Sequence, residues 1–212
     1  MKNKVIVATK NQGKIKEIKS IFNSKEWEIV TMSEEGLDID ITEDGNTFEE
    51  NSLIKARCVR DAFIAGGSKG ANEYDEVYVF ADDSGLEVDA LNKEPGVYWA
   101  RYMGEDTSYH IKNKAIIDRL EGVEKKDRTA RSVCAHSSID LSGNEKVVRE
   151  AMEGYIGYEE AGENGFGYDP IFMLEEYGCT SAEIPMEEKN KISHRGKAIG
   201  EMLKLLTEGG AQ

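Results

Sequence analysis

Two adjacent aspartates, Asp82 and Asp83, follow an apolar run in the stretch "VYVFADDSG", and a serine comes directly after them. In open α/β sheets, ligands bind beyond the carboxyl ends of the strands. Successive side chains of a strand face opposite ways, so only one of the two carboxylates is expected to enter a binding site. Such a carboxylate can hold a metal ion or take a proton from water. A simple turn is the alternative, because Asp-Asp-Ser-Gly is good turn chemistry.

A second candidate is "VATKNQGKIKEI", residues 7 to 18, where an apolar run gives way to a helical pattern that begins with lysines. A helix start has unpaired N–H groups and a partial positive charge, which favour acidic residues. Lys14 and Lys16 are better explained if an anion binds there. Neither a P-loop nor a dinucleotide fingerprint fits the glycine positions. What remains is a phosphate held by backbone N–H groups, Thr9, Asn11 and Lys14, or else a solvated helix start.

The acidic stretch "DIDITEDGNTFEEN" invites comparison with a calcium loop that begins at Asp40. The comparison fails at the twelfth position, where Asn51 replaces the bidentate glutamate. Mg²⁺ usually takes one or two carboxylates together with substrate phosphates and water, so a magnesium role for one of these acids stays open. The others are expected to form a solvated face.

Two further stretches combine rings and positive charge. "GFGYDP" offers aromatic residues, an acid and glycines, which suits stacking on a flat ring, while "KNKISHRG" gathers Lys189, Lys191, His194 and Arg195 near a helix start. An arginine can donate two hydrogen bonds to O6 and N7 of a purine, and an exocyclic 6-amino group disrupts that pairing. A buried aromatic turn and a basic surface patch are the alternatives.

The hydrophobic periodicity predicts elements that could position these residues. Strands are expected at 4–9 and 27–32. A further strand is expected to end at the two aspartates, with another one after a glycine turn. Residues 129–141 and 145–157 are expected to form an antiparallel pair of strands. Helices are expected from Asn11 to about Asn23, over 48–63, over 107–120 with Ile111, Ala115, Ile116 and Leu120 inward, and from Ile192 to Leu206. This order predicts one α/β domain, residues 1–212, with a mixed sheet and two lobes around a cleft.

The composition excludes several classes of protein. The net charge of −14 argues against sequence-independent binding to nucleic acid, which needs basic surface. No apolar stretch is long enough to span a bilayer, and no signal peptide is evident, so a cytoplasmic protein is expected. Cys58, Cys134 and Cys179 lie far apart, which favours buried free thiols over a zinc site or a disulfide framework.

Six ordered motifs together resemble one family, the inosine triphosphate pyrophosphatases, which act on non-standard purine nucleoside triphosphates. The matching segments are "VATKNQGKIKEI", "TFEENSLIKA", "FADDSGLEVDAL", "PGVYWARY", "GFGYDPIF" and "SHRGKA". The resemblance implies an elongated mixed central sheet flanked by helices, a homodimer, and Mg²⁺-dependent hydrolysis of ITP, dITP, XTP and dXTP to the monophosphate and pyrophosphate.

The resemblance also implies a role for each matching residue. Asp83 would be the catalytic base, and Glu43 with Asp83 would hold the metal. The substrate-binding residues would be Thr9, Lys10, Asn11, Gln12, Gly13, Lys14 and Lys55 for the triphosphate, Ser84 beside the base, and Phe166, Gly167, Tyr168, Asp169, Lys189, His194 and Arg195 for the purine ring, with Ser193 orienting the last loop.

Two departures from the family pattern concern Lys10, where the family often has glycine or asparagine, and the loop at 66–76, which is longer than expected. Lys10 either adds a phosphate contact or is simply exposed. Two other functions stay open: a pyrophosphatase for other modified nucleotides, and a nucleotide-binding module without catalysis.

Overall fold

The computed structural model describes residues 2–22 and 25–208, and these form two compact units. The first unit contains the chain up to Asp83, the segment Cys134–Arg149 and the chain from Ala198 onward. The second contains Ser84–Val133 and Glu150–Lys197. A single domain over residues 1–212 therefore stays a prediction.

The strands join in one seven-stranded sheet of order β2-β1-β3-β4-β5-β6-β7. β1 is parallel to β2 and β3, whereas β6 is antiparallel to β5 and β7, so the predicted α/β class with a mixed sheet is confirmed. The strands are β1 (Lys2–Val7), β2 (Trp27–Thr31), β3 (Tyr74–Val88), β4 (Thr129–Asp140), β5 (Glu145–Ile156), β6 (Phe172–Leu174) and β7 (Cys179–Thr180), and the helices are α1 (Gln12–Ile21), α2 (Phe48–Ala65), α3 (Tyr109–Arg119), α4 (Met186–Ile192) and α5 (His194–Glu208).

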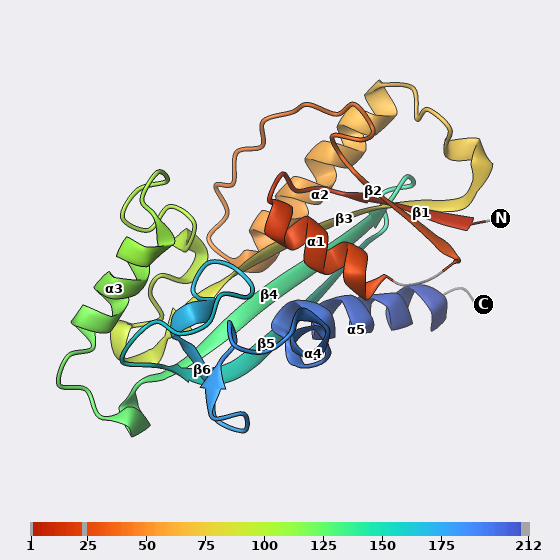
Figure 1. Ribbon diagram of the computed structural model, residues 1–212. Coiled ribbons are helices and arrows are strands. Elements are labelled where there is room, and N and C mark those ends of the chain that lie inside the picture. Colours follow the sequence, from red (N-terminus) through yellow and green to blue (C-terminus); the bar gives the residue numbers. More distant parts are fainter. Residues whose placement is uncertain (1, 23–24, 209–212) are drawn as a thin grey trace. The chain divides into compact units, whose positions relative to one another are not determined.

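Strand alternation gives the first unit two apolar faces. Val5 and Val7 of β1 pack with Ile18 of α1 and Met202 of α5, whereas Ile6 packs with α2 on the other face. Figure 1 shows α1 and α2 with the strands that they cover. Because successive strand side chains point to opposite faces, a continuous apolar run is what a strand covered on both sides requires.

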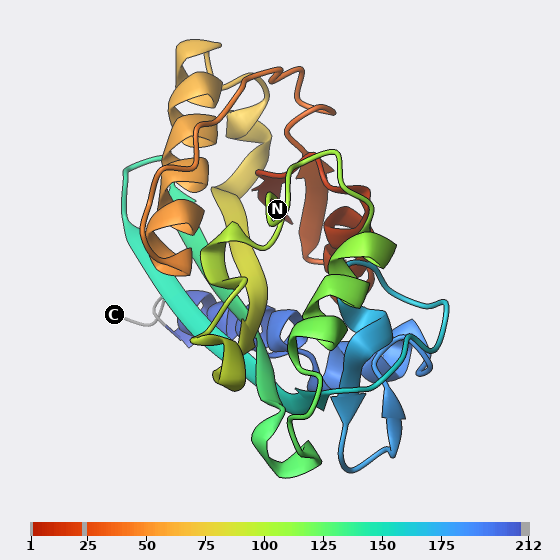
Figure 2. The same cartoon turned by 90° about the vertical axis from the view of Figure 1, so that its left-hand side faces the viewer.

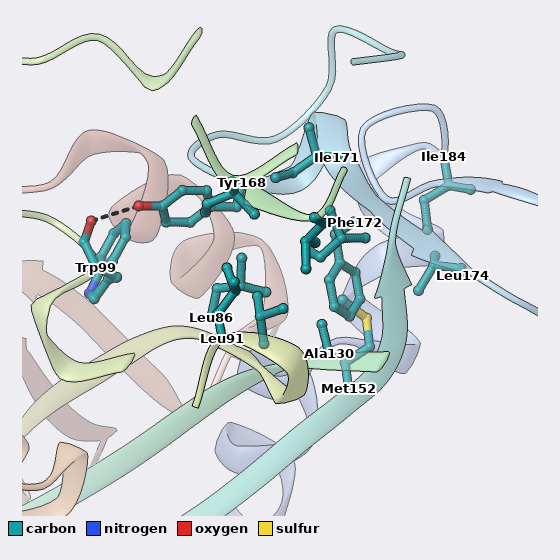
Figure 3. Packing of buried hydrophobic residues seen from close by; sticks show 14 residues of the cluster. Leu86, Leu91, Trp99, Ala130, Met152, Tyr168, Ile171, Phe172, Leu174 and Ile184 are labelled. Carbon is teal, nitrogen blue, oxygen red and sulfur yellow. Dashed lines mark hydrogen bonds between the residues drawn. The ribbon is translucent and has the colours of Figure 1, made fainter. Parts of the chain in front are cut away.

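The core of the second unit lies between α3 and the strands. Ile116 of α3 and Leu120, the C-cap of that helix, share a cluster of buried residues with Phe172 and Leu174 of β6, and Figure 2 shows α3 and β6 in this unit. Tyr168 and Trp99 belong to the same cluster. The Tyr168 hydroxyl group donates a hydrogen bond of 3.1 Å to the carbonyl oxygen of Trp99, drawn as a dashed line in Figure 3. The loop that carries Tyr168 is thereby fixed to the core.

The prediction of two strands separated by a glycine turn at Asp82 and Asp83 is wrong. β3 is a single strand of 15 residues, Tyr74–Val88, and it passes directly through both aspartates. Both side chains are buried, at 1% and 3% exposure. A buried lysine approaches each carboxylate, so neither charge has to leave the sheet and the strand can continue.

Three helix predictions need correction. α1 ends at Ile21, and Asn23 lies outside the described residues. In α3 the buried residues are Lys112, Asn113 and Ile116, and Leu120, the C-cap, is buried as well, while the predicted Ile111 is 51% exposed. The C-terminal helix does not start at Ile192, because Ser193 has an extended backbone that separates α4 from α5.

The cysteines are free, but only part of the expectation about their burial holds. Cys134 is buried and Cys179 is half-buried, while Cys58 on α2 is exposed. Within residues 2–22 and 25–208, no helix combines the length and the apolar character that crossing a membrane requires.

Candidate functional site

The start of α1 is built by side chains that the sequence analysis selected. Asn11 is the N-cap and accepts a hydrogen bond of 3.1 Å from the Lys14 N–H group. The Thr9 hydroxyl oxygen accepts one of 3.2 Å from the Asn11 N–H group, and the Gln12 amide donates to the Lys10 carbonyl oxygen at 3.4 Å. The first turn contains no acidic residue, so the positive end of the helix dipole keeps its attraction for an external anion.

Lys14 forms a buried ion pair. Its side chain is 6% exposed, and Nζ lies 3.1 Å from Asp82 Oδ2 and 3.4 Å from the Asp82 carbonyl oxygen. Asp82 therefore has a function that the sequence analysis did not assign, as the counter-ion of Lys14. Lys16 is exposed on α1, so of the two lysines only Lys14 is buried.

Lys10 bridges to the acidic segment. Its Nζ lies 3.1 Å from Asp38 Oδ1 and 3.5 Å from Asp40 Oδ1, and all three side chains are more than half exposed. The hydrogen bond with Asp38 is the main cause of a raised pKa of Lys10. The predicted phosphate contact of Lys10 has to compete with these two carboxylates.

Asp83 lies on the face of β3 that carries α2. Its Oδ2 accepts a hydrogen bond of 3.0 Å from the Asn51 amide, and its Oδ1 is 3.6 Å from Lys55 Nζ. Burial raises the pKa of the Asp83 carboxyl, although Lys55, Lys14 and the hydrogen bond from Asn51 act in the opposite direction. A carboxylate whose pKa moves toward neutrality is better suited to take a proton from water.

Lys55 joins two predicted metal-holding residues. Its Nζ donates to Glu43 Oε2 at 2.6 Å and also faces Asp83. Burial lowers the pKa of Lys55, but Asp83, Glu43 and Asp82 outweigh it and the pKa is raised. This lysine is therefore a permanent cation between carboxylates.

The carboxylates of the first unit fit a magnesium ion that takes its other ligands from elsewhere. Among the described residues, no group of three or more His, Cys, Asp or Glu side chains is arranged to hold a metal. Glu43 and Asp83, which both lie against the Lys55 ammonium group, provide two carboxylates as hard oxygen donors. Mg²⁺ is commonly held by one or two carboxylates with substrate phosphates and water, so two are enough.

In the second unit, Asp169 organises the glycine-rich loop. Its Oδ2 accepts hydrogen bonds from the Phe166 N–H group at 2.8 Å and from Lys189 Nζ at 2.6 Å, and its Oδ1 accepts one from the Ser181 hydroxyl group at 2.8 Å. Gly165 has a φ of +74°, and a Cβ there would lie 2.2 Å from Asp169 Oδ2. The loop needs glycine at this position to close over the carboxylate.

Two cations face the Phe166 ring. Lys189 Nζ lies 5.6 Å from the ring centroid, and the Arg195 guanidinium carbon lies 5.7 Å from it. Phe166 is only half-buried, so part of its ring is available to a ligand. A pocket in this unit is lined by Ser84, Gly85, Leu86, Trp99, Ser132, Phe166, Gly167, Tyr168, Asp169, Lys189, His194 and Arg195.

The junction between α4 and α5 fixes Arg195. Arg195 is 2% exposed and its Nη2 donates a hydrogen bond of 2.9 Å to the Ser84 hydroxyl oxygen. The Ser193 hydroxyl oxygen accepts from the Gly196 N–H group at 3.0 Å, and a Cβ on Gly196 would lie 1.8 Å from the Asn190 carbonyl oxygen. The tight junction depends on that glycine, and it holds His194 and Arg195 in the pocket lining.

Tyr168 and Gly167 have structural contacts in the same loop. Tyr168 is buried, its ring meets Tyr109 edge-on at 5.4 Å, and burial raises the pKa of its hydroxyl group. The Gly167 carbonyl oxygen accepts from the Asn113 amide at 3.3 Å. Tyr168 therefore supports the loop from the core side.

Three polar residues contact the predicted site residues, and the sequence did not indicate these roles for them. Asn51 contacts Asp83, Asp82 contacts Lys14, and Ser181 contacts Asp169. Each of Asn51, Asp82 and Ser181 is at most 1% exposed. Asn51 could have been noticed as an amide four positions before Lys55, which places both on one face of a helix. Ser181 carries no comparable signal, because its partner lies in a different segment of the chain.

Fold and site define an α/β protein whose mixed sheet carries buried lysine–carboxylate pairs. The profile of the Ham1 family matches residues 5–205. The chain is 43% identical over 202 residues to a dITP/XTP pyrophosphatase of Bacillus subtilis (strain 168), covering 95% of this chain and 96% of the relative. It is 45% identical over 197 residues to one from Caldanaerobacter subterraneus subsp. tengcongensis, covering 92% of each.

Solved structures agree with these relatives. The Ham1 protein of Staphylococcus aureus matches with a TM-score of 0.80 and 38% identity, over 98% of this chain and 99% of the other. The Ham1 protein of Coxiella burnetii matches with a TM-score of 0.82 and 33% identity, over 98% and 100%. The chain belongs to the Ham1 family, and the resemblance found in its motifs is confirmed.

Replacing Asp169 by asparagine is expected to lower the free energy of unfolding by about 2 kcal/mol, because hydrogen bonds to charged groups contribute about 1.5 to 3 kcal/mol. Urea denaturation measures the loss. Asp118→Asn is the matched control, because Asp118 pairs with Lys114 on the surface of α3, where such pairs contribute little. Equal losses in the two variants would show that Asp169 does not organise the loop.

Proposed function

We propose that this chain hydrolyses non-standard purine nucleoside triphosphates, namely ITP, dITP, XTP and dXTP, to the monophosphate and pyrophosphate. The reaction would cleanse the nucleotide pool and prevent misincorporation into DNA and RNA. The observation that carries the proposal is similarity over more than nine-tenths of the chain to relatives named dITP/XTP pyrophosphatase.

The triphosphate would bind at the start of α1. The N–H groups at the start of α1, with Thr9, Asn11 and the residues up to Lys14, offer donors to phosphate oxygens. Lys14 and Lys55 add positive charge, and both are held by carboxylates. Cleavage between the α and β phosphates spreads negative charge, so fixed cations stabilise the transition state more than the ground state.

Asp83 would accept the proton of the attacking water. Glu43 and Asp83 would hold Mg²⁺, which when bound supplies charge neutralisation at the phosphates. The raised pKa of Asp83 that burial causes supports the role of base. The ammonium group of Lys55 would offset the repulsion between the Glu43 and Asp83 carboxylates. It would also be available to bind a phosphate oxygen.

The purine ring would stack on Phe166. Lys189, His194 and Arg195 would read the 6-keto group, with Asp169 holding Lys189 and Ser84 holding Arg195. Adenine carries an amino group at this position and would leave the donors unpaired. A buried donor without a partner costs about 1 to 3 kcal/mol, which corresponds to a preference of about five- to a hundred-and-fortyfold.

Product identification tests the proposal. Incubation with ITP and Mg²⁺ is expected to give IMP and pyrophosphate, detected by ion-exchange chromatography or ³¹P NMR. A panel of ITP, XTP, dUTP, GTP and ATP is expected to favour ITP and XTP over ATP. Release of IDP and orthophosphate would contradict the reaction, and tight binding of ITP without turnover would indicate a binding module instead.

Three associated features are proposed with this function. They are Mg²⁺ as the metal, a homodimer, and the cytoplasm as the site of action. Light scattering of the purified protein tests the dimer, and replacing Mg²⁺ by Ca²⁺ tests the metal, since the larger Ca²⁺ takes six to eight ligands in a flexible geometry.

A further inference from the structure

Asn51 lies at the centre of the contacts that connect α2 to β3 and to the acidic loop. It is 1% exposed and sits in the first turn of α2, whose start is capped by Thr47. Its amide nitrogen donates to Asp83 Oδ2 at 3.0 Å, and its amide oxygen accepts from the Gly45 N–H group at 2.9 Å. One side chain therefore contacts both the strand and the loop.

The chemistry of the two partners fixes the orientation of the amide. An ionised carboxylate only accepts hydrogen bonds and a backbone N–H group only donates. The amide satisfies both only with its nitrogen toward Asp83 and its oxygen toward Gly45. Neither an ionised aspartate nor leucine, which are similar in size, could make both contacts.

The loop is closed tightly on this amide. A Cβ at Gly45 would lie 2.7 Å from Asn51 Oδ1 and 2.8 Å from Glu50 Cβ, so any side chain at position 45 would displace the contact. Glu43 is two residues before Gly45, and it accepts from Lys55 at 2.6 Å. Lys55 follows Asn51 by four residues, which puts the two side chains on one face of α2.

Lys55 and Asn51 hold the Glu43 and Asp83 carboxylates through different contacts. Lys55 contacts Glu43 and Asp83 Oδ1, while Asn51 contacts Asp83 Oδ2 and the loop that carries Glu43. If a cation and a phosphate group draw Lys55 away, Asn51 still keeps the strand and the loop together. We infer that Asn51 is a positioning residue that sets the spacing of Glu43 and Asp83 for a divalent cation. The inference rests on the proposed function for the choice of that cation.

Binding of Mn²⁺ to the protein without nucleotide tests this inference, with free Mn²⁺ followed by its paramagnetic resonance signal. Asn51→Ala is expected to raise the Kd for Mn²⁺ by about tenfold or more, since loss of an outer partner of a metal ligand commonly costs ten- to a hundredfold. The concentration of Mg²⁺ at half-maximal ITP turnover is expected to rise by a similar factor. Binding of tripolyphosphate without cation is expected to stay unchanged, because the α1 start is not altered.

Ser52→Ala is the matched control. Ser52 is the next residue of α2, is fully buried, and donates a hydrogen bond of 3.0 Å to the Glu49 carbonyl oxygen without contacting a carboxylate. Its Kd for Mn²⁺ is expected to equal that of the wild type. Gly45→Ala disturbs the same contact from the loop side, so it keeps the test decisive if Asn51→Ala does not fold.

The outcomes separate this inference from the proposed function. Equal Mn²⁺ affinities in the wild type and in folded Asn51→Ala or Gly45→Ala would overturn it, as would a wild type that does not bind Mn²⁺. A wild type that binds Mn²⁺ but does not cleave ITP would contradict the proposed function alone, and the comparison of Mn²⁺ affinities would still decide the role of Asn51.

Discussion

An Asp83→Asn variant is expected to fold and to lose turnover of ITP by about a thousandfold, because a general base contributes about a hundred- to ten-thousandfold to the rate. An amide cannot accept the proton of the attacking water and is a weaker ligand for a hard cation. Stability is expected to change little, since burial already disfavours the charged form of this carboxyl. Steady-state kinetics and thermal unfolding measure the two effects.

Asp89→Asn provides the contrast. Asp89 lies 3.0 Å from Arg131 and also pairs with Lys93, and the hydrogen bond from Arg131 is the main cause of a pKa far below the usual range. A lowered pKa means that the ionised carboxylate stabilises the fold at pH values above the ordinary aspartate pKa near 4, and that this contribution is lost as the pH falls. Asp89→Asn is therefore expected to lower stability at pH 7 and to spare turnover.

The pair of variants distinguishes chemistry from folding. Asp83→Asn should affect turnover and Asp89→Asn should affect stability. If Asp83→Asn retained turnover within tenfold of the wild type, the assignment of Asp83 as base and metal ligand would be wrong, even if the protein hydrolysed ITP to IMP and pyrophosphate.

A Lys14→Met variant is expected to lose both stability and activity. It leaves the buried Asp82 carboxylate without the ammonium group that lies 3.1 Å away, and breaking a buried ion pair by removing one partner costs about 3 to 5 kcal/mol. It also removes a cation from the proposed phosphate site, which is expected to lower kcat/KM by about ten- to a hundredfold, as a charged hydrogen bond of about 1.5 to 3 kcal/mol implies.

The double variant Lys14→Met/Asp82→Asn separates these two losses. Replacing a buried ion pair by neutral groups is often close to neutral for stability, so unfolding is expected to return near the wild-type midpoint. The loss in kcat/KM is expected to persist, because the phosphate contact is still missing. Recovery of activity together with stability would show that Lys14 is a structural cation and does not bind the triphosphate.

The local features near α1 could be predicted from sequence because they depend on neighbouring residues. Asn11 caps the helix through Lys14, three positions on, and the strand at β1 follows from a short β-branched run. The helix expected over 48–63 likewise follows from its hydrophobic period, and α2 spans Phe48–Ala65. Such contacts join residues within a turn of each other, so the spacing alone contains the information.

Predictions failed where a distant partner changed the local preference. The Asp-Asp-Ser-Gly sequence favours a turn, but Lys14 and Lys55, from two different helices, neutralise Asp82 and Asp83 and let β3 continue. The break at Ser193 depends on the close approach of Gly196 to the Asn190 carbonyl oxygen. The spacing of hydrophobic residues along the sequence contains no information about either effect.

By itself, the sequence determined the α/β class, the order of the elements, the family and the residue types available for chemistry, because these follow from periodicity and from ordered motifs. The tertiary structure alone decided which charges are paired: Lys14 with Asp82, Lys55 with Glu43 and Asp83, and Lys189 with Asp169. The sequence separations of these pairs range from 12 to 68 residues. A buried charge is stable only beside its partner, and that partner is brought near by the packing of the whole chain.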